Sequence, residues 1–227
     1  MSFRPFRALA AATASMAIFA LAPAALAGTP GVHQITGAKL AKALLPASSF
    51  GRGYKAMRPI DTGNSLQPGT DAFHIATMSC SSFWNIYGEP ALGETALASD
   101  DVSNRAALID DQEIVYQLPS ARAAKSFYST GFAKYGKCRH ITLSGGGSPT
   151  MYVKTQSIAK THVGRYTAFA VTQQDTFAHL PGSLYTFTLF AMAGDDAFIL
   201  EANTPTAAKP NLTALAARLI SRVSALH

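Results

Sequence analysis

Residues 184–202 read LYTFTLFAMAGDDAFILEA, and this stretch decides the fold class. The segments Leu184–Ala193 and Ala197–Ala202 are rich in aromatic and aliphatic side chains, as β-strands are. Only the residues from Gly194 to Asp196 lie between them, and a connection this short joins antiparallel neighbours. We therefore predict a β-hairpin here.

The hairpin continues a run of predicted strands. Working back along the chain, these strands are Arg165–Gln173, Met151–Ile158, Ile141–Leu143, Ile109–Leu118 and Phe73–Met78. Short turns separate the later ones, including a glycine-rich turn from Gly145 to Pro149. The second half of the chain therefore predicts consecutive antiparallel strands.

Capping residues followed by apolar residues at helical spacing predict three helices. They begin after Thr36, Ser120 and Asn211. In the second helix the apolar stripe is Ala121, Ala124, Tyr128, Phe132 and Tyr135. Strands and helices do not alternate strictly, so the order predicts an α+β fold, a twisted antiparallel sheet with helices packed on one side.

The first 27 residues have the layout of a secretory signal peptide. Basic Arg4 and Arg7 precede the apolar run Ala8–Leu21, and small residues end at Ala27. A membrane anchor is the alternative, but the run is shorter than the roughly 20 residues that a membrane-spanning helix needs. We predict cleavage near Ala27, a flexible lead-in at 28–36, and one domain at 37–227 that is secreted into an extracytoplasmic compartment or the cell envelope without a transmembrane span.

Composition excludes several classes of protein. The chain is 48% hydrophobic and 14% charged, which excludes a disordered protein. Its formal net charge is only +6, with scattered lysines, which argues against nucleic-acid binding. Two cysteines, Cys80 and Cys138, exclude a four-cysteine zinc site. In an oxidising compartment they predict a disulfide, and two free buried thiols are the alternative.

Known catalytic motifs are absent or incomplete. Ser157 and Lys160 match Ser-x-x-Lys, but the partner motifs of penicillin-recognising enzymes are missing, as is Gly-x-Ser-x-Gly. Two acidic clusters could hold calcium, although solvated edges are the simpler interpretation: Asp110, Asp111 and Glu113, and Asp195 with Asp196. We therefore predict no catalytic residue, no metal site and no cofactor. A pair of catalytic carboxylates stays open, because their separation depends on the fold.

Several residues follow the order and spacing of a known family. They are Leu44-Leu45-Pro46, Phe50 and Gly53-Tyr54, then Cys80 with Trp84, a strand ending at Tyr116, and a helix with Ser120, Ala121, Ala124 and Phe127 that closes at Cys138. This pattern resembles the PknH-like extracellular sensor domains, found on a mycobacterial serine/threonine kinase and on free-standing secreted or lipid-anchored actinobacterial proteins. The resemblance extends over about Leu40 to Ser224.

The resemblance implies an antiparallel sheet flanked by helices, with a cleft for an unidentified ligand. It also implies that Cys80 and Cys138 form the first of the family's disulfides. This chain departs from the family in having no kinase domain and no cysteine after Cys138 for a second disulfide. Tyr135 stands where a tryptophan is expected. The family supplies no catalytic residue to carry over.

These observations predict a secreted, non-catalytic, sensor-like domain. It would bind a small molecule, lipid or envelope component in an aromatic-lined cleft, with Trp84 and Tyr116 as candidate ligand-binding residues. A cell-envelope protein-interaction module with a protein partner is the first alternative. An exported small hydrolase is the second.

Overall fold

The computed structural model describes residues 35–57, 60, 62, 75–78, 80, 94–107, 109–145 and 148–227. The predicted signal peptide 1–27 and Trp84 lie outside these residues. Among the helices of the described residues, none has both the length and the apolar character needed to span a membrane.

One antiparallel sheet of nine strands forms the centre of the molecule, in the order β1-β3-β4-β9-β8-β7-β6-β5-β2. The strands are β1 Lys55–Ala56, β2 Ile75–Met78, β3 Ala96–Asn104, β4 Ile109–Gln117, β5 His140–Gly145, β6 Ser148–Val163, β7 Tyr166–Phe177, β8 Leu184–Ala193 and β9 Asp196–Thr204. The predicted hairpin is confirmed as β8 and β9, with Ala193 opposite Asp196 and a left-handed glycine, Gly194 at φ 64°, in the turn. The α+β fold class is confirmed.

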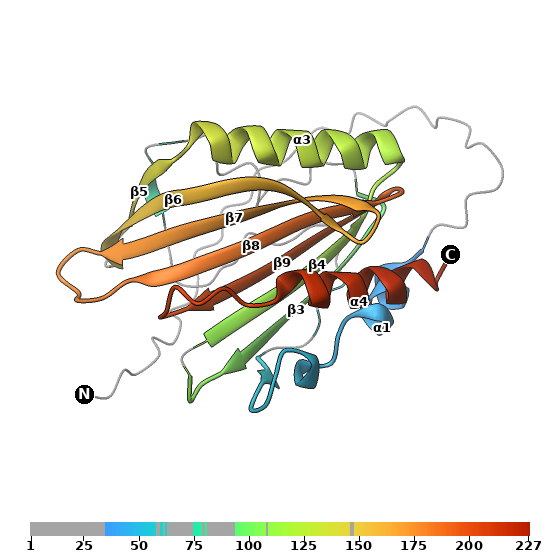
Figure 1. The fold of residues 1–227 in the computed structure, drawn as a ribbon, viewed down its shortest axis with the longest axis horizontal. Coiled ribbons are helices and arrows are strands. Elements are labelled where there is room, and N and C mark those ends of the chain that lie inside the picture. The colour runs from blue at the N-terminus through green and yellow to red at the C-terminus, as the bar shows by residue number, and fades with distance from the viewer. Residues whose placement is uncertain are drawn as a thin grey trace, which may run out of the picture.

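The strands β5 to β9 form a continuous meander, in which each strand pairs with the next. Helix α3 (Ala121–Lys137) connects β4 to β5 across the sheet, and the meander then returns until β9 pairs with β4 (Figure 1). Strands that are distant in sequence therefore meet at the middle of the sheet.

The three predicted helices are present with their predicted caps. They are α1 (Gly37–Ala43), α3 and α4 (Leu212–Ser224), and a short 3-10 helix, η1 (Ala47–Ser49), follows α1. The side chains of Thr36, Ser120 and Asn211 accept hydrogen bonds from backbone N–H groups in the first turns. These bonds satisfy donors that a helix start leaves unpaired.

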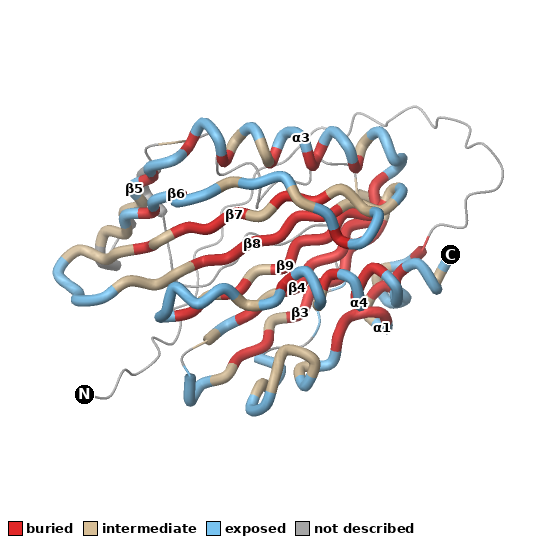
Figure 2. The backbone as a smooth tube through the Cα atoms, in the orientation of Figure 1, coloured by how far each residue is buried: buried red, intermediate tan, exposed pale blue. Residues whose placement is uncertain are grey.

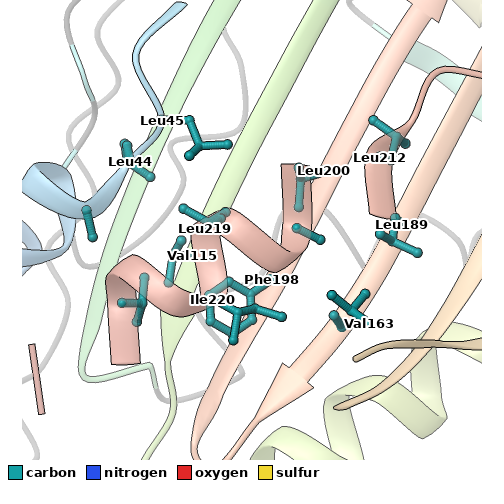
Figure 3. Close-up of a cluster of buried hydrophobic side chains, with 14 of the residues drawn as sticks. Leu44, Leu45, Val115, Val163, Leu189, Phe198, Leu200, Leu212, Leu219 and Ile220 are labelled. Carbon is teal, nitrogen blue, oxygen red and sulfur yellow. The ribbon is translucent and has the colours of Figure 1, made fainter. Parts of the chain in front are cut away.

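The prediction that the helices pack on one side of the sheet is wrong. Along β9, Ile199 belongs to the core beneath α3, whereas Phe198 and Leu200 belong to the core shared with α1 and α4 (Figure 3). Successive strand residues point to opposite faces, so both faces carry a helix layer. The continuous run of buried residues in the central strands reflects this double cover (Figure 2).

Beneath α3 the core is aromatic. Phe169 stacks on Phe190 with ring centroids 4.4 Å apart, and the ring of Tyr135 meets both at steeper angles. Tyr128 adds an edge contact with Phe169, and its hydroxyl donates a hydrogen bond of 2.9 Å to the Ala168 carbonyl. Tyr135, which stands where the family resemblance leads one to expect a tryptophan, is fully buried here.

On the opposite face, α4 holds α1 in place. The Arg222 guanidinium donates hydrogen bonds of 2.6 and 2.8 Å to the carbonyls of Ala43 and Lys42, which end α1. The folded part also extends into the predicted lead-in, because Ile35 is 3% exposed and its N–H bonds to the Gln117 side chain.

The sequence did not predict β3. Its residues, ALASDDVSN, carry few β-branched or aromatic side chains. It is a strand because it pairs with β4 along its whole length.

Candidate functional site

The predicted disulfide is present. Cys80 and Cys138 are bonded with their Cα atoms 6.0 Å apart. Cys138 caps the C-terminus of α3, and the bond ties that helix end to the residue that lies just beyond β2. Ile141 and Val153 pack around it in a small apolar cluster.

A groove of about 410 Å³ opens on the sheet over β5, β6 and β7. Its lining combines one aromatic ring, two basic side chains, three further polar side chains and two aliphatic residues: Tyr152, His140, Lys154, Thr142, Gln174, Thr176, Ile141 and Val153. Small-molecule sites are typically concave and combine apolar surface with a few placed polar groups.

Strand register brings the polar side chains of the groove together. Thr142 lies opposite Tyr152, which lies opposite Thr176, and this forms one row across the three strands. His140, Lys154 and Gln174 form a second row by the same pairing. Side chains directly opposite on one face are about 5 Å apart, so the rows make a compact grid.

Tyr152 occupies the centre of the first row, and its side chain is 48% exposed. In the second row the Gln174 amide is fixed by two hydrogen bonds: it accepts from Gln156 at 2.7 Å and donates to Ser183 at 2.9 Å. The grid therefore places the solvent-exposed aromatic ring of Tyr152 beside the oriented amide of Gln174.

The groove carries one positive charge, that of Lys154. Among the described residues that line it, none is acidic. A ring compound with an anionic group would match this arrangement, with the ring against Tyr152 and the anion near Lys154.

The groove is open because α4 covers only part of its face of the sheet. The core beneath α4 includes Val163 and Ala168, at the far ends of β6 and β7 from the groove. Figure 2 shows exposed and intermediate residues on β6 and β7 toward their other ends. The uncovered ends carry Tyr152 and Thr176.

A second polar group lies on the α3 face, beyond the aromatic core. Thr186 donates to Asp175 at 2.9 Å, and Asn203 donates to Glu201 at 3.3 Å. Burial raises the pKa of Asp175 to about 6 and also raises the pKa of Glu201. Asp175, Thr186 and Thr188 are each less than a tenth exposed. Glu201 and Asn203 are partly exposed, so this network is more enclosed than the groove but is not sealed from solvent.

A third polar group lies beneath α1. Glu113 is fully buried and accepts a hydrogen bond of 2.6 Å from the Leu45 N–H. Asp100 lies directly opposite Glu113 and is 8% exposed. Burial, with a smaller contribution from the Asp100 charge, raises the pKa of Glu113 to about 8. Burial also raises the pKa of Asp111 to about 6.

The prediction that the acidic clusters are solvated edges is wrong for three residues. Asp111, Glu113 and Asp196 are each 5% exposed or less, because all three point to the face covered by α1 and α4. Turn and strand-end positions in a sequence do not reveal that a helix lies over them.

Of the two candidate ligand-binding residues, only Tyr116 lies in the described part of the chain. It is 4% exposed and packs against Phe127 of α3, with ring centroids 5.7 Å apart. Burial, with the nearby Glu94 charge, raises the pKa of its hydroxyl above the ordinary value. A ligand contact at Tyr116 stays a prediction, and the contacts it makes are those of a core residue.

The structure separates Ser157 from Lys160. The two residues pair in register with Thr172 and Phe169, so they are three positions apart on a regular part of β6 and point to opposite faces. Lys160 lies over the Phe132 ring, 5.3 Å from its centroid. The pair therefore cannot act as a serine–lysine dyad.

Sequence reasoning missed Tyr152, Lys154 and Gln174. Tyr152 and Lys154 lie in a predicted strand and Gln174 lies one residue beyond the end of another, but only the register of three strands shows that they share one face. The available signal was alternation, since Tyr152 and Lys154 are two apart and flank the inward-pointing Val153.

Neither a protein-family model nor a curated protein matches the sequence. Among solved structures, the fold is similar to the crystal structure of the extracellular domain of PknH from Mycobacterium tuberculosis, with a TM-score of 0.65 and 15% identity over 86% of this chain and 100% of that one. An uncharacterized protein from Mycobacterium smegmatis aligns with a TM-score of 0.44 and 11% identity, over 82% of this chain and 96% of that one. The PknH likeness confirms the fold that the residue pattern implied.

Proposed function

We propose that this protein is an extracytoplasmic, sensor-like domain whose groove over β5 to β7 binds a small ring compound with an anionic group, such as an acidic sugar. The observation that carries the proposal is the open groove of about 410 Å³ with Tyr152 exposed at its centre. The groove is large enough for one or two sugar-sized rings.

Each part of the grid has a role in this proposal. The Tyr152 ring supplies a flat apolar surface against which a ligand ring can lie. Lys154 attracts the anion, and the His140 ring and the fixed Gln174 amide can bond to ligand hydroxyl groups. Among the described lining residues, Lys154 without a carboxylate beside it favours an anion over a cation.

Two observations support a place outside the cytoplasm. The fold is shared with an extracellular domain, and the described cysteines form a disulfide, which persists in oxidising compartments. The predicted signal peptide agrees with both. We infer that the protein is exported and acts as a soluble receptor or as part of an envelope assembly.

A binding role also fits the position of the buried carboxylates. Asp100 and Glu113 lie side by side, as a catalytic pair would, but they are almost fully enclosed beneath α1. A substrate would have to displace that helix to reach them. The groove, in contrast, is accessible but has no carboxylate among its lining residues.

Ligand-observed NMR with glucuronic acid, glucose and inorganic phosphate tests the groove. We expect glucuronic acid to bind best. Tyr152→Ala should weaken its affinity by about tenfold, the effect of losing roughly 1.4 kcal/mol of ring contact. Tyr152→Phe should retain binding because it keeps the ring. His162→Ala is the matched control, since His162 is exposed on β6 outside the groove.

Replacing Lys154 tests the contribution of its positive charge separately from that of the Tyr152 ring. Lys154→Gln should remove the preference for glucuronic acid over glucose, whereas Lys209→Gln, on an exposed loop, should leave it unchanged. Equal binding of all three probes by the wild type and Tyr152→Ala would reject the groove as the site. No binding to any of the probes would reject the ligand class.

A further inference from the structure

Three metal-ligating side chains meet at the turn between β8 and β9. Asp195 comes from the turn, Asp196 is the first residue of β9, and His227 comes from just beyond the end of α4. One ligand atom from each residue lies within 4.8 Å of the ligand atoms of the other two. None of these residues lines the groove over β5 to β7.

The spacing of the two closest atoms suits a small cation. His227 Nε2 lies 3.0 Å from Asp196 Oδ2. Zn²⁺ binds nitrogen and oxygen at about 2.1 Å in tetrahedral geometry, which places neighbouring ligands about 3.4 Å apart. The two atoms share a hydrogen bond in this structure, so a metal ion would replace that bond and move the two atoms apart by about 0.4 Å.

A second, independent observation points to a missing partner at Asp196. This residue is only 3% exposed, and its Oδ1 atom is buried without a hydrogen-bond partner in the described part of the chain. Buried polar atoms in native proteins almost always have a partner. A cation on this carboxylate would neutralise it and supply what Oδ1 lacks.

The hairpin side of the site is fixed in space, whereas the His227 side chain is 37% exposed. The Asp195 carbonyl accepts a hydrogen bond of 2.9 Å from the Leu118 N–H, which ties the turn to the end of β4. Gly194 adopts the left-handed conformation that the tight turn requires. On the other side, backbone bonds from Ala225 and Leu226 continue the last turn of α4 toward His227.

We infer that Asp195, Asp196 and His227 bind one divalent transition-metal ion of the Zn²⁺ type. Imidazole nitrogen and carboxylate oxygen both bind zinc, whereas calcium and magnesium prefer oxygen ligands alone. Water would complete the coordination sphere. The bound ion would fasten the end of α4 to the β8–β9 hairpin, and it is independent of the proposed groove ligand.

Calorimetric titration of the full-length protein with ZnCl₂ tests the inference. We expect one Zn²⁺ per chain, bound more tightly than roughly 100 μM. His227→Ala and Asp195→Asn should each weaken binding by at least about tenfold. His162→Ala removes an exposed histidine elsewhere and should bind as the wild type does. Asp196 is left intact, because replacing a buried residue could unfold the protein.

Cobalt supplies a readout that a purely structural ion pair would not give. With Co²⁺ in place of Zn²⁺, the wild type should show a visible absorption band that saturates at one ion per chain, and His227→Ala should lose it. Equal Zn²⁺ affinity in the wild type and His227→Ala would overturn the site. So would binding only in the millimolar range, which would leave Asp196 and His227 as a simple ion pair.

Discussion

The protonation of Glu113 bears on the stability of the protein. Its pKa is about 8 in the folded protein against 4.5 for the free side chain, chiefly because burial disfavours the charged form. Between these values the folded state holds the proton more tightly than the unfolded state. The free energy of unfolding therefore falls as pH rises through this window, by up to about 1.4 kcal/mol per pH unit.

Glu113→Gln should flatten this dependence. The glutamine oxygen can still accept the Leu45 N–H, and the amide carries no charge at any pH. Urea unfolding at pH 5 and pH 8 measures the effect. We expect the wild type to lose more stability than Glu113→Gln on going to pH 8. Parallel losses would show that Glu113 is not protonated in the folded protein at neutral pH.

Arg222 fixes α1 through two hydrogen bonds to carbonyls that the helix end leaves free. Arg222→Ala should lower the free energy of unfolding by about 1–3 kcal/mol. Arg222→Lys keeps the charge but not the planar fork, so its loss should be intermediate. Denaturant titration would contradict this role if the two variants were equally stable.

Alanine substitutions at two glycines of α3, Gly131 and Gly136, distinguish the effect of helix propensity on stability from the effect of packing. A Cβ at Gly136 would meet no atom of the described residues within 4 Å, so Gly136→Ala should stabilise the protein by about 1 kcal/mol. A Cβ at Gly131 would lie 3.3 Å from the Phe169 ring. Gly131→Ala should therefore gain less or lose stability. Thermal unfolding of both variants checks the order, and an equal gain would mean that Phe169 moves freely.

The disulfide ties α3 to the segment after β2. Replacing Cys80 and Cys138 together with serine should lower the free energy of unfolding by about 2–5 kcal/mol. The double replacement avoids an unpaired reactive thiol. A thiol-labelling assay on the native wild type should detect no free cysteine, and labelling of two thiols would show that the bond does not form.

Which elements were predictable follows from what determines each of them. The helices that begin after Ser120 and Asn211 carry their own caps and apolar stripes, so sequence predicted them. The β8–β9 hairpin carries its own turn. Strand β3 depends on pairing with β4, and the groove depends on the register of Tyr152 with Thr142 and Thr176, so neither appears in a single segment.

For the whole molecule, the centre of the sheet should be the most protected region. Strands β4, β9 and β8 are bonded on both edges and covered on both faces. Amide hydrogen exchange should be slowest there and fastest in β1 and β2, which form the sheet edges. Equally fast exchange in β4 and β1 would mean that the sheet opens from its middle.

The pairing of β4 with β9 also governs how quickly the molecule can form. It joins Asp110 to Asn203 and Gln117 to Asp196, with α3 and four strands of the meander between them along the chain. The hairpins of the meander need only short loops to close. The pairing of β4 with β9 must instead close a loop that contains α3 and four strands, and long-range pairing of this kind slows folding. A newly made chain thus passes through a stage at which β4 and β9 each have an unpaired edge. At that stage it is most exposed to aggregation, even if its native form is very stable.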